Sequence, residues 1–222
     1  NNAFIGEGTV KVTCLDPNAE IHYTTDGSEP TATSPLYEKI VPVKEALILK
    51  GATFAHGRQM GKTLILPVRW NLATAKPVLG TNPAEKLLTN GIRGSLKYSD
   101  FEWCSWADND SVSFTIDLLK PEVLNTLILG CITNNGMAIH KPASVRVEVS
   151  DDNSKFREAV VQSFTSEEIF REGNFIENLS LKLGGTQARY VRVTAKGPGV
   201  CPASHVRPGQ TSRIFFDEVM LE

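Results

Sequence analysis

Three tryptophans are the side chains in this chain best suited to binding the flat apolar face of a ligand. They are Trp70, Trp103 and Trp106. An exposed aromatic ring can pack against the apolar side of a pyranose while a few polar groups bind its hydroxyls. Trp70 closes an alternating segment and is expected in the core, whereas Trp106 lies in a polar loop that ends at Ser111. We therefore expect Trp106 to be exposed and to provide the aromatic platform of a ligand site.

Polar side chains that would complete such a site fall in two further loops. The candidates are Asn134, Asn135, His140, His205, Arg207 and Arg213. Binding residues concentrate in loops on rigid scaffolds, which favours a ligand role for this set. The same residue types also have structural uses, because Asn-Gly pairs form turns and isolated histidines are commonly packed or solvated. The sequence leaves both interpretations open.

No pattern typical of a catalytic centre is present. Glycoside hydrolysis, for example, needs two carboxylates on opposite sides of the bond that breaks. The adjacent acids Asp151-Asp152 and Glu167-Glu168 stand instead in expected turns or loops, beside a like charge. Motifs for phosphate binding, dinucleotide binding, zinc proteolysis and serine hydrolysis are missing from the sequence. We therefore expect no catalytic residue in this chain.

Four cysteines are widely separated along the chain, at Cys14, Cys104, Cys131 and Cys201. They form no CxxC pair of the kind that binds zinc or exchanges disulfides, so the sequence gives little support for a metal cluster or a redox site. We expect free thiols that behave as small apolar side chains.

The composition of the 222 residues, 41% hydrophobic and 22% charged, is typical of globular domains. A formal net charge of −2 leaves no broad basic field, so we expect no nucleic-acid partner. No segment approaches the roughly 18 apolar residues that a membrane span needs, so we expect no membrane insertion. The chain opens on Asn1-Asn2 without a signal-peptide pattern, which we interpret as the start of an excised or processed fragment.

Short segments that alternate between apolar and polar residues run through most of the chain. Examples are residues 10–14, 64–70, 112–118, 145–149 and 179–183. Only residues 84–88 suggest a helical turn. Many short strands separated by turn signals predict an all-β protein with two antiparallel β-sandwiches. Small residues and a proline interrupt the pattern at 73–77, so we expect domains at residues 1–75 and 76–222.

Residues 19–31, with the sequence AEIHYTTDGSEPT, indicate a strand that runs into a tight turn. Asp26 can accept backbone N–H bonds, and Gly27 tolerates a positive φ. Together with SPLY at residues 34–37, this segment resembles the chitobiase/β-hexosaminidase C-terminal domain. The resemblance covers about residues 4–70. It implies a fibronectin-like β-sandwich, appended to secreted and mostly bacterial glycoside hydrolases as a spacer or packing domain.

Separated motifs in the second part occur in the order typical of discoidin domains. They are LTNG at 88–91, WCS at 103–105, IDL at 116–118, the hairpin residues between 142 and 156, and ARYVRV at 188–193. This part resembles the discoidin family, also called coagulation-factor C-type or galactose-binding-like domains, which are jelly-roll β-sandwiches that bind sugars or lipid headgroups. The resemblance implies that Trp103 packs inside. The chain departs from the family pattern at Asn90, Leu119 and Asn153, where the family has Asp, Gly and Gly.

The discoidin resemblance also implies a structural calcium ion. Sugar-binding members hold it with backbone carbonyls, the turn aspartate and a carboxylate near the end of the domain. The matching residues are Asn90 and Glu218, with Leu87 and Ser95 as further oxygen donors. Hard cations prefer several oxygen ligands including carboxylates, and Asn90 keeps the oxygen without the charge. The alternative is that Asn90-Gly91 is a simple turn and Glu218 a solvated strand residue.

The order of the two modules resembles the end of a β-N-acetylhexosaminidase-like glycoside hydrolase whose catalytic barrel lies outside this chain. We expect a non-catalytic accessory region that is secreted, periplasmic or on the cell surface of a bacterium. The expected partners are a galactose- or N-acetylhexosamine-type glycan and the catalytic domain of the same polypeptide. The alternative is a purely structural pair of domains that packs against the barrel and binds no sugar. A lipid-headgroup role is disfavoured because the loops lack paired apolar tips and a basic rim.

Overall fold

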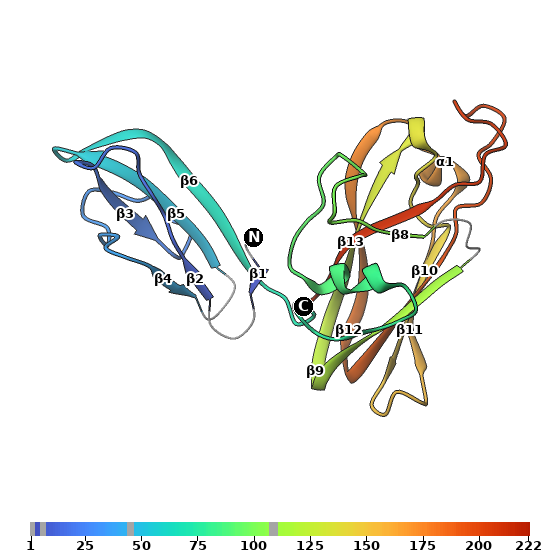
Figure 1. Ribbon diagram of the computed structural model, residues 1–222. Helices are drawn as coiled ribbons and strands as arrows, with labels where there is room; N and C mark the ends of the chain where they lie inside the picture. The colour runs from blue at the N-terminus through green and yellow to red at the C-terminus, as the bar shows by residue number, and fades with distance from the viewer. Residues whose placement is uncertain (1–2, 5–7, 44–46, 107–110) are drawn as a thin grey trace. The chain divides into compact units, whose positions relative to one another are not determined.

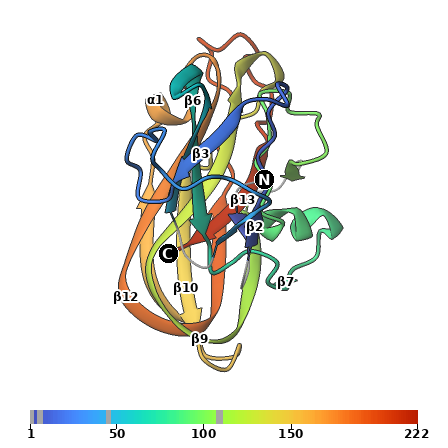
Figure 2. The ribbon, with the colours of Figure 1, turned by 90° about the vertical axis from the view of Figure 1, so that its left-hand side faces the viewer.

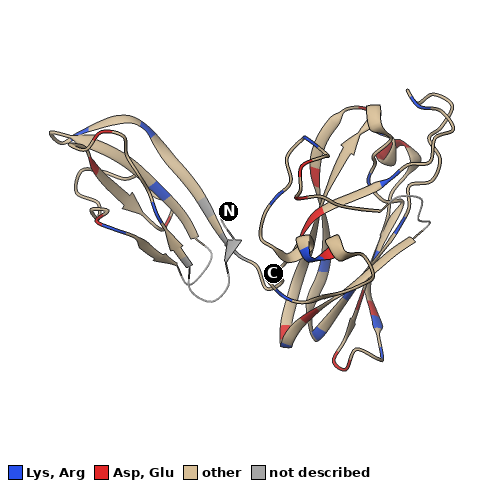
Figure 3. Ribbon diagram, in the orientation of Figure 1, with Lys and Arg blue, Asp and Glu red and all other residues tan. Residues whose placement is uncertain are grey.

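A computed structural model of the chain describes residues 3–4, 8–43, 47–106 and 111–222. The chain divides into two compact units, one formed by residues up to 71 and the other by residues 72–222 (Figure 1). Both consist mainly of antiparallel strands, which confirms the all-β fold class. Among the described residues, no helix combines the length and apolar character that crossing a membrane requires. Acidic and basic residues are interspersed along the strands of both units (Figure 3).

The first unit holds two sheets in its described part. One has the order β1 (Ala3–Phe4), β6 (Arg58–Trp70), β5 (Leu47–Ala55) and β3 (Glu20–Thr24), and the other pairs β2 (Gly8–Val10) with β4 (Val41–Val43). All these pairs are antiparallel except β1 with β6. The buried apolar residues are Val41, Val43, Leu49, Ala52, Phe54 and Val68. The side chain of Trp70 lies outside the described part, so its burial stays a prediction.

The turn after β3 has the geometry that its residue types predict. Asp26 Oδ1 accepts hydrogen bonds from the Ser28 amide at 3.0 Å and from the Ser28 hydroxyl at 2.6 Å. Gly27 has a φ of 80°. The Tyr37 hydroxyl accepts from the Val12 amide at 2.9 Å. The motif residues of this unit therefore form turns and internal contacts, as a structural domain requires.

The second unit contains most of the strands. Its elements are β7 (Val78–Leu79), η1 (Pro83–Thr89), β8 (Cys104–Trp106), β9 (Ser111–Asn134), η2 (Asn135–Met137), β10 (Ser144–Ser150), β11 (Arg157–Ser163), α1 (Ser166–Ile169), β12 (Asn174–Lys196) and β13 (Ile214–Leu221). The 3₁₀ helix η1 confirms the helical turn predicted for residues 84–88. The Asn82 side chain caps it by accepting from the Ala84 amide at 3.0 Å.

Two long strands, β9 and β12, run through both layers of the second unit, and both curve along its length (Figure 2). Residues 111–117 of β9 pair with residues 190–196 of β12. On its other side β12 pairs with β10, and β10 pairs with β11. Residues 126–134 of β9 pair with 174–182 of β12, and this half of β9 also pairs with β13. The register shifts between the two halves, so one pair of strands supplies both layers of the β-sandwich.

The core of this unit is formed by the alternating positions that the sequence predicts. They include Val112, Phe114, Ile116, Leu118, Val145, Val147, Val149, Leu179, Leu181 and Leu183, all at most 5% exposed. The four cysteines are free thiols, and all except the half-buried Cys14 are buried. Their expected behaviour as unpaired thiols is therefore confirmed.

Two residues that stand where the discoidin pattern has a turn glycine adopt a backbone conformation typical of glycine. Leu119 has a φ of 70° and Asn153 a φ of 59°, so both residues occupy the left-handed region that favours glycine. The Leu119 amide donates to Asp117 Oδ1 at 2.8 Å. Arg189 of the ARYVRV motif holds the same carboxylate with two hydrogen bonds, at 2.8 and 2.9 Å. The central strand end and the ARYVRV strand are thus joined by one ion pair.

Candidate functional site

Three segments meet at one end of the second unit, which we call the loop end: residues 134–140, 164–173 and 197–213. The His140 amide donates to the Arg213 carbonyl at 3.1 Å, and the Asn135 amide to the Gly173 carbonyl at 3.2 Å. The structure thereby brings together all the polar candidates predicted outside the tryptophan loop. They are Asn134, Asn135, His140, His205, Arg207 and Arg213.

Most of these polar groups hold the loops to one another. Asn134 Oδ1 accepts from the Met137 amide at 3.2 Å, and Asn135 Oδ1 accepts from the Gly173 amide at 3.0 Å. Arg207 donates to the Gly136 carbonyl, and Arg213 donates to the Met137 carbonyl at 3.2 Å. Only Arg207 is exposed, while Asn134 and Arg213 are partly exposed. The set therefore makes the loop end rigid more than it presents groups to solvent.

The two histidines are inside the loop end. His140 is 0% exposed and His205 is 8% exposed, and their ring centroids lie 4.9 Å apart. Phe170 packs edge-on against both rings, at 5.1 and 6.1 Å. Burial, and after it the neighbouring His205, lowers the pKa of His140 to about 4, although the Ile169 backbone acts in the opposite direction. Both side chains are thus largely enclosed, and the predicted ligand role of the two histidines stays a prediction.

Trp106 is buried, so its predicted role as an exposed platform is wrong. It is 8% exposed, stacks on Phe114 with centroids 6.2 Å apart, and meets Phe216 edge-on at 5.6 Å. Trp106 ends strand β8, in which Cys104 and Trp106 face inward and Ser105 faces outward. The polar residues that suggested exposure, Asp108, Asn109 and Asp110, lie outside the described part. The inward orientation of the Trp106 side chain follows from the alternation along β8 and not from the polarity of the residues after it.

Trp103 is a core residue, as the discoidin resemblance implies. It is 6% exposed, and its Nε1 donates to the Ser95 carbonyl at 3.0 Å. A methyl group at Gly94 would lie 2.2 Å from the indole, so this glycine is required for the close approach of the loop.

A pocket of about 520 Å³ opens on the loop end, within the usual size of roughly 300–1,000 Å³ for small-ligand sites. It is lined by Ser166, Glu167, Phe170, Arg171, Glu172, Pro202 and Ser204. The Arg171 guanidinium lies 4.0 Å from the centre of the Phe175 ring, which orients it. The walls thus combine one aromatic ring with a guanidinium, two carboxylates and two hydroxyls.

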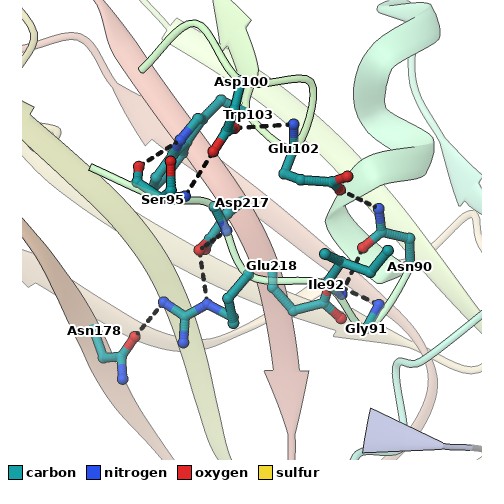
Figure 4. Close-up of polar contacts among 12 residues, drawn as sticks. Asn90, Gly91, Ile92, Ser95, Asp100, Glu102, Trp103, Asn178, Asp217 and Glu218 are labelled. Carbon is teal, nitrogen blue, oxygen red and sulfur yellow. Dashed lines mark hydrogen bonds and ion pairs between the residues drawn. The ribbon is translucent and has the colours of Figure 1, made fainter. Parts of the chain in front are cut away.

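A second polar cluster joins the loop of residues 90–102 to strand β13 (Figure 4). Glu218 accepts from the Gly91 amide at 3.0 Å. Asn90 donates to Glu102 at 3.0 Å, and its Oδ1 accepts from the Ile92 amide at 2.7 Å. The structure therefore brings Asn90 and Glu218 into one cluster, as the predicted calcium site requires.

The neighbouring acid, Asp217, anchors the same loop. Asp217 Oδ2 accepts from Arg93 Nε at 2.7 Å and from the Gly94 amide at 3.0 Å (Figure 4). Arg93 also donates to Asn178 at 2.9 Å. Both acids of β13 are buried, at 0% and 1% exposure, so the interpretation of Glu218 as a solvated strand residue is wrong.

Two family models match the chain. Residues 73–206 match the model of the F5/8 type C domain. The chain belongs to the F5/8 type C domain family. Residues 1–64 match the model of the chitobiase/beta-hexosaminidase C-terminal domain. Both resemblances seen in the motifs are therefore confirmed, in the same order along the chain.

Solved structures similar to the chain cover about two thirds of it. CpGH89CBM32-6 of Clostridium perfringens is 18% identical, with a TM-score of 0.45, over 68% of this chain and 98% of that one. A fucose binding module of Streptococcus pneumoniae is 18% identical, with a TM-score of 0.41, over 68% and 96%. The C-terminal domain of a chitobiase from Bacteroides fragilis is 16% identical, with a TM-score of 0.37, over 62% and 78%. No curated protein matches the chain.

The groups around Asn90 in the F5/8 type C domain include carboxylate, amide and carbonyl oxygens, the donor types that a hard cation prefers. Two carboxylates, those of Glu218 and Glu102, flank the Asn90 amide, and the Ser95 backbone belongs to the same loop. Burial raises the pKa of Glu218 to about 8, with the Gly91 amide acting in the opposite direction. A cation would favour the charged form of this buried carboxyl. Each of these groups also accepts a hydrogen bond within the chain, so calcium binding here stays a prediction.

Several residues of the F5/8 type C domain were missed as site residues. Phe170 and Arg171 line the pocket, but they follow the short helix α1, where a lone FR pair carries no recognisable pattern. Asp217 could have been found, because two adjacent acids in the apolar segment IFFDEVML require internal partners. Cys201 shares a loop with His205, but the two residues meet His140 only in three dimensions.

Proposed function

We propose that the chain is a non-catalytic accessory region of a secreted, periplasmic or cell-surface bacterial glycoside hydrolase, in which the F5/8 type C domain binds a glycan. The order of the two matched families supports a β-N-acetylhexosaminidase-like parent enzyme. One observation carries the binding role: the pocket at the loop end joins the ring of Phe170 to the charged and hydroxyl groups around it. The favoured ligand is a galactose- or N-acetylhexosamine-type sugar.

The chemistry of the pocket suits a sugar. A pyranose has an apolar face, which Phe170 can contact, and hydroxyls that bind carboxylates and guanidinium groups. Arg171 is 56% exposed, and its stacking on Phe175 keeps donors available at the pocket rim. The hydrogen bonds of the loop end fix this arrangement before a ligand arrives, which lowers the entropic cost of binding.

Hydrolysis in this pocket is disfavoured. Glu167 and Glu172 are both exposed, so the burial that keeps a general acid protonated is missing at both positions. The interspersed charges also give no support to a nucleic-acid partner. We therefore assign catalysis to a part of the parent enzyme outside this chain.

A calcium ion is part of the proposal. Glu218 and Asn90 would hold it, with Glu102 as a second carboxylate and oxygen from Ser95. The ion would supply positive charge that stabilises the buried carboxylate and fixes the loop of residues 90–102. The asparagine in place of the family aspartate weakens the affinity, because it removes one negative charge.

The alternative function, a purely structural pair of domains, has support in the first unit. Large apolar side chains are exposed on its strands β5 and β6, namely Ile48 at 47%, Met60 at 53%, Leu64 at 45% and Ile65 at 58%. Such side chains suit packing against another domain of the same polypeptide. The two roles can belong to different units, with packing by the first and binding by the second.

A glycan array followed by calorimetry tests the proposal. Arg171→Ala should weaken binding of the best glycan about tenfold or more, which corresponds to roughly 1.4 kcal/mol. Arg146→Ala is the matched control, because Arg146 is 55% exposed and lies on β10, away from the pocket residues. An array without any bound glycan would favour the structural alternative. Equal affinities of both variants would place the sugar elsewhere.

A further inference from the structure

Three side chains that ligate transition metals meet inside the loop end. One ring nitrogen from each of His140 and His205 and the Sγ of Cys201 lie within 4.8 Å of one another. The three residues are 0%, 8% and 3% exposed. His140 follows η2 at the end of β9, whereas Cys201 and His205 belong to the loop before β13. The set therefore joins two loops that are more than sixty residues apart in the sequence.

His140 is the unusual member of the set. Neither of its ring nitrogens has a hydrogen-bond partner of ordinary geometry, although the side chain is fully buried. Burying a polar group without a partner is unfavourable, and native proteins rarely leave both nitrogens of a histidine unpaired. A metal ion beside the ring would supply the missing interaction.

The ligand types select the metal. A thiolate with two imidazoles suits Zn²⁺, Co²⁺ or copper, whereas Ca²⁺ and Mg²⁺ prefer oxygen. Around a tetrahedral zinc ion, ligand atoms lie about 3.3–3.8 Å apart, given bond lengths near 2.0–2.3 Å. Separations of up to 4.8 Å must therefore shorten by as much as roughly 1–1.5 Å when the ion binds. The Ser212 hydroxyl, 3.3 Å from Cys201 Sγ, adds an oxygen beside the set.

We propose that His140, Cys201 and His205 form a buried binding site for a transition metal ion of the zinc type. On binding, Cys201 releases its proton to solvent and ligates the metal as a thiolate. The ion closes the loop after β9 onto the loop before β13. Because Phe170 contacts both histidines and also lines the pocket, the bound ion also fixes one wall of that pocket.

Existing contacts of His205 must change on binding. Its Nδ1 accepts from the Arg207 amide at 3.0 Å, and its Nε2 lies 3.4 Å from Asn135 Nδ2. Metal ligation through either nitrogen displaces one of these donors. Ligation through Nδ1 displaces the Arg207 amide, and ligation through Nε2 displaces the Asn135 side-chain amide, so binding should shift the NMR resonance of one of these two groups.

Cobalt spectroscopy on the full chain tests the proposal. After chelator treatment, Co²⁺ should produce thiolate-to-metal charge-transfer absorption at a stoichiometry of one ion per chain, and Zn²⁺ should remove it. Cys201→Ser and His140→Phe should each abolish this absorption. Cys14→Ser is the control, because Cys14 lies in the first unit and outside the set. An absence of thiolate absorption in the wild-type chain would overturn the proposal, as would equal absorption in Cys201→Ser.

Thermal unfolding gives an independent readout. A hundredfold excess of free Zn²⁺ over its Kd should raise the Tm of the second unit by about 5–10 °C. His140→Phe should fold without metal, because it keeps a ring against Phe170 and removes two unpaired nitrogens. Its Tm should not respond to Zn²⁺. A Zn²⁺ response retained in His140→Phe would show binding elsewhere and refute the site.

Discussion

Gly130 of β9 lies directly beneath the Asp217 carboxylate of β13, so that a methyl group built on Gly130 would be 2.0 Å from Oδ1. Phe216 pairs with Cys131 and Val219 with Leu129, so the single residue Gly130 opposes both acids. This is a β-bulge. It allows two adjacent acids of one strand to bind the same loop, Asp217 through Arg93 and Gly94 and Glu218 through Gly91 (Figure 4).

Arg93→Ala should destabilise the second unit by about 3–5 kcal/mol, because it leaves the buried Asp217 carboxylate without its cation. Arg146→Ala removes an arginine from an ion pair in which both side chains are more than half exposed, and should cost less than about 1 kcal/mol. Urea unfolding of both variants measures the difference. Similar losses in the two variants would show that Asp217 does not depend on Arg93.

Leu119→Gly should stabilise the domain by about 0.5–1 kcal/mol. A leucine at a φ of 70° costs roughly 1–2 kcal/mol, and the extra chain entropy of glycine removes only part of the gain. Little packing is lost because Leu119 is 56% exposed. Val123→Gly is the control, since Val123 is 54% exposed but has no positive φ, and it should be destabilising. A Tm of Leu119→Gly below that of the wild type would show that the positive φ of Leu119 does not strain the backbone.

The ion pair of Asp117 with Arg189 should make stability depend on pH in the acid range. The Arg189 guanidinium holds the pKa of Asp117 below its ordinary value of 3.8. A depressed carboxyl pKa stabilises the folded state above the unfolded pKa, and this contribution disappears as the pH falls through the folded pKa. Asp117→Asn should therefore lower the Tm at about pH 6 and differ little from wild type well below pH 3.8. If the Tm difference between Asp117→Asn and the wild type stayed constant over this pH range, the ion pair of Asp117 with Arg189 would not be its cause.

Trp106→Ala should behave as a core truncation and cost about 3–5 kcal/mol, because the indole packs between Phe114 and Phe216. Trp106→Phe should cost clearly less, since a ring still fills the site. Glycan affinity measured on folded Trp106→Phe should equal that of the wild type. A large loss of affinity with little loss of stability would restore the ligand role for this residue.

Calcium should stabilise the second unit by roughly 1–3 kcal/mol when its free concentration is 10–100 times its Kd, and this should appear as a higher Tm. Glu218→Gln should abolish the increase while keeping the oxygen that accepts from Gly91. Asn90→Asp should tighten calcium binding because it restores a carboxylate. Melting curves with calcium and with chelator measure all three proteins. Identical curves in the wild type under both conditions would refute calcium binding.

The fold could be predicted from the sequence because its signals are local. The alternation at Val145, Val147 and Val149 puts these side chains on one face of a strand, and this follows from the local sequence alone. The turn at Asp26-Gly27 and the left-handed Asn153 likewise follow from the residue types. The ordered motifs then identified both families, although no single motif was specific.

The candidate site was less predictable because its contacts depend on loops distant in sequence. The loop residues were correctly grouped at one end, yet burial of His140 and His205 depends on Phe170, which carries no sequence signal of its own. Trp106 is buried because it alternates with the outward-facing Ser105 in β8, and polar residues that follow a strand do not fix the orientation of its last side chain. The sequence places Cys201 near His205, but no local pattern brings His140 to them.

The placement of β13 has a consequence for biosynthesis. This strand is the last of the unit to leave the ribosome, yet it lies between β9 and β8 and supplies both buried acids. Leu221 pairs with Leu127, and the Glu222 amide donates to Thr126 at 3.0 Å. The earlier strands therefore cannot complete their core before β13 has been synthesised. Folding of this unit must wait until residues 214–222 have emerged, which keeps the nascent domain open throughout its synthesis.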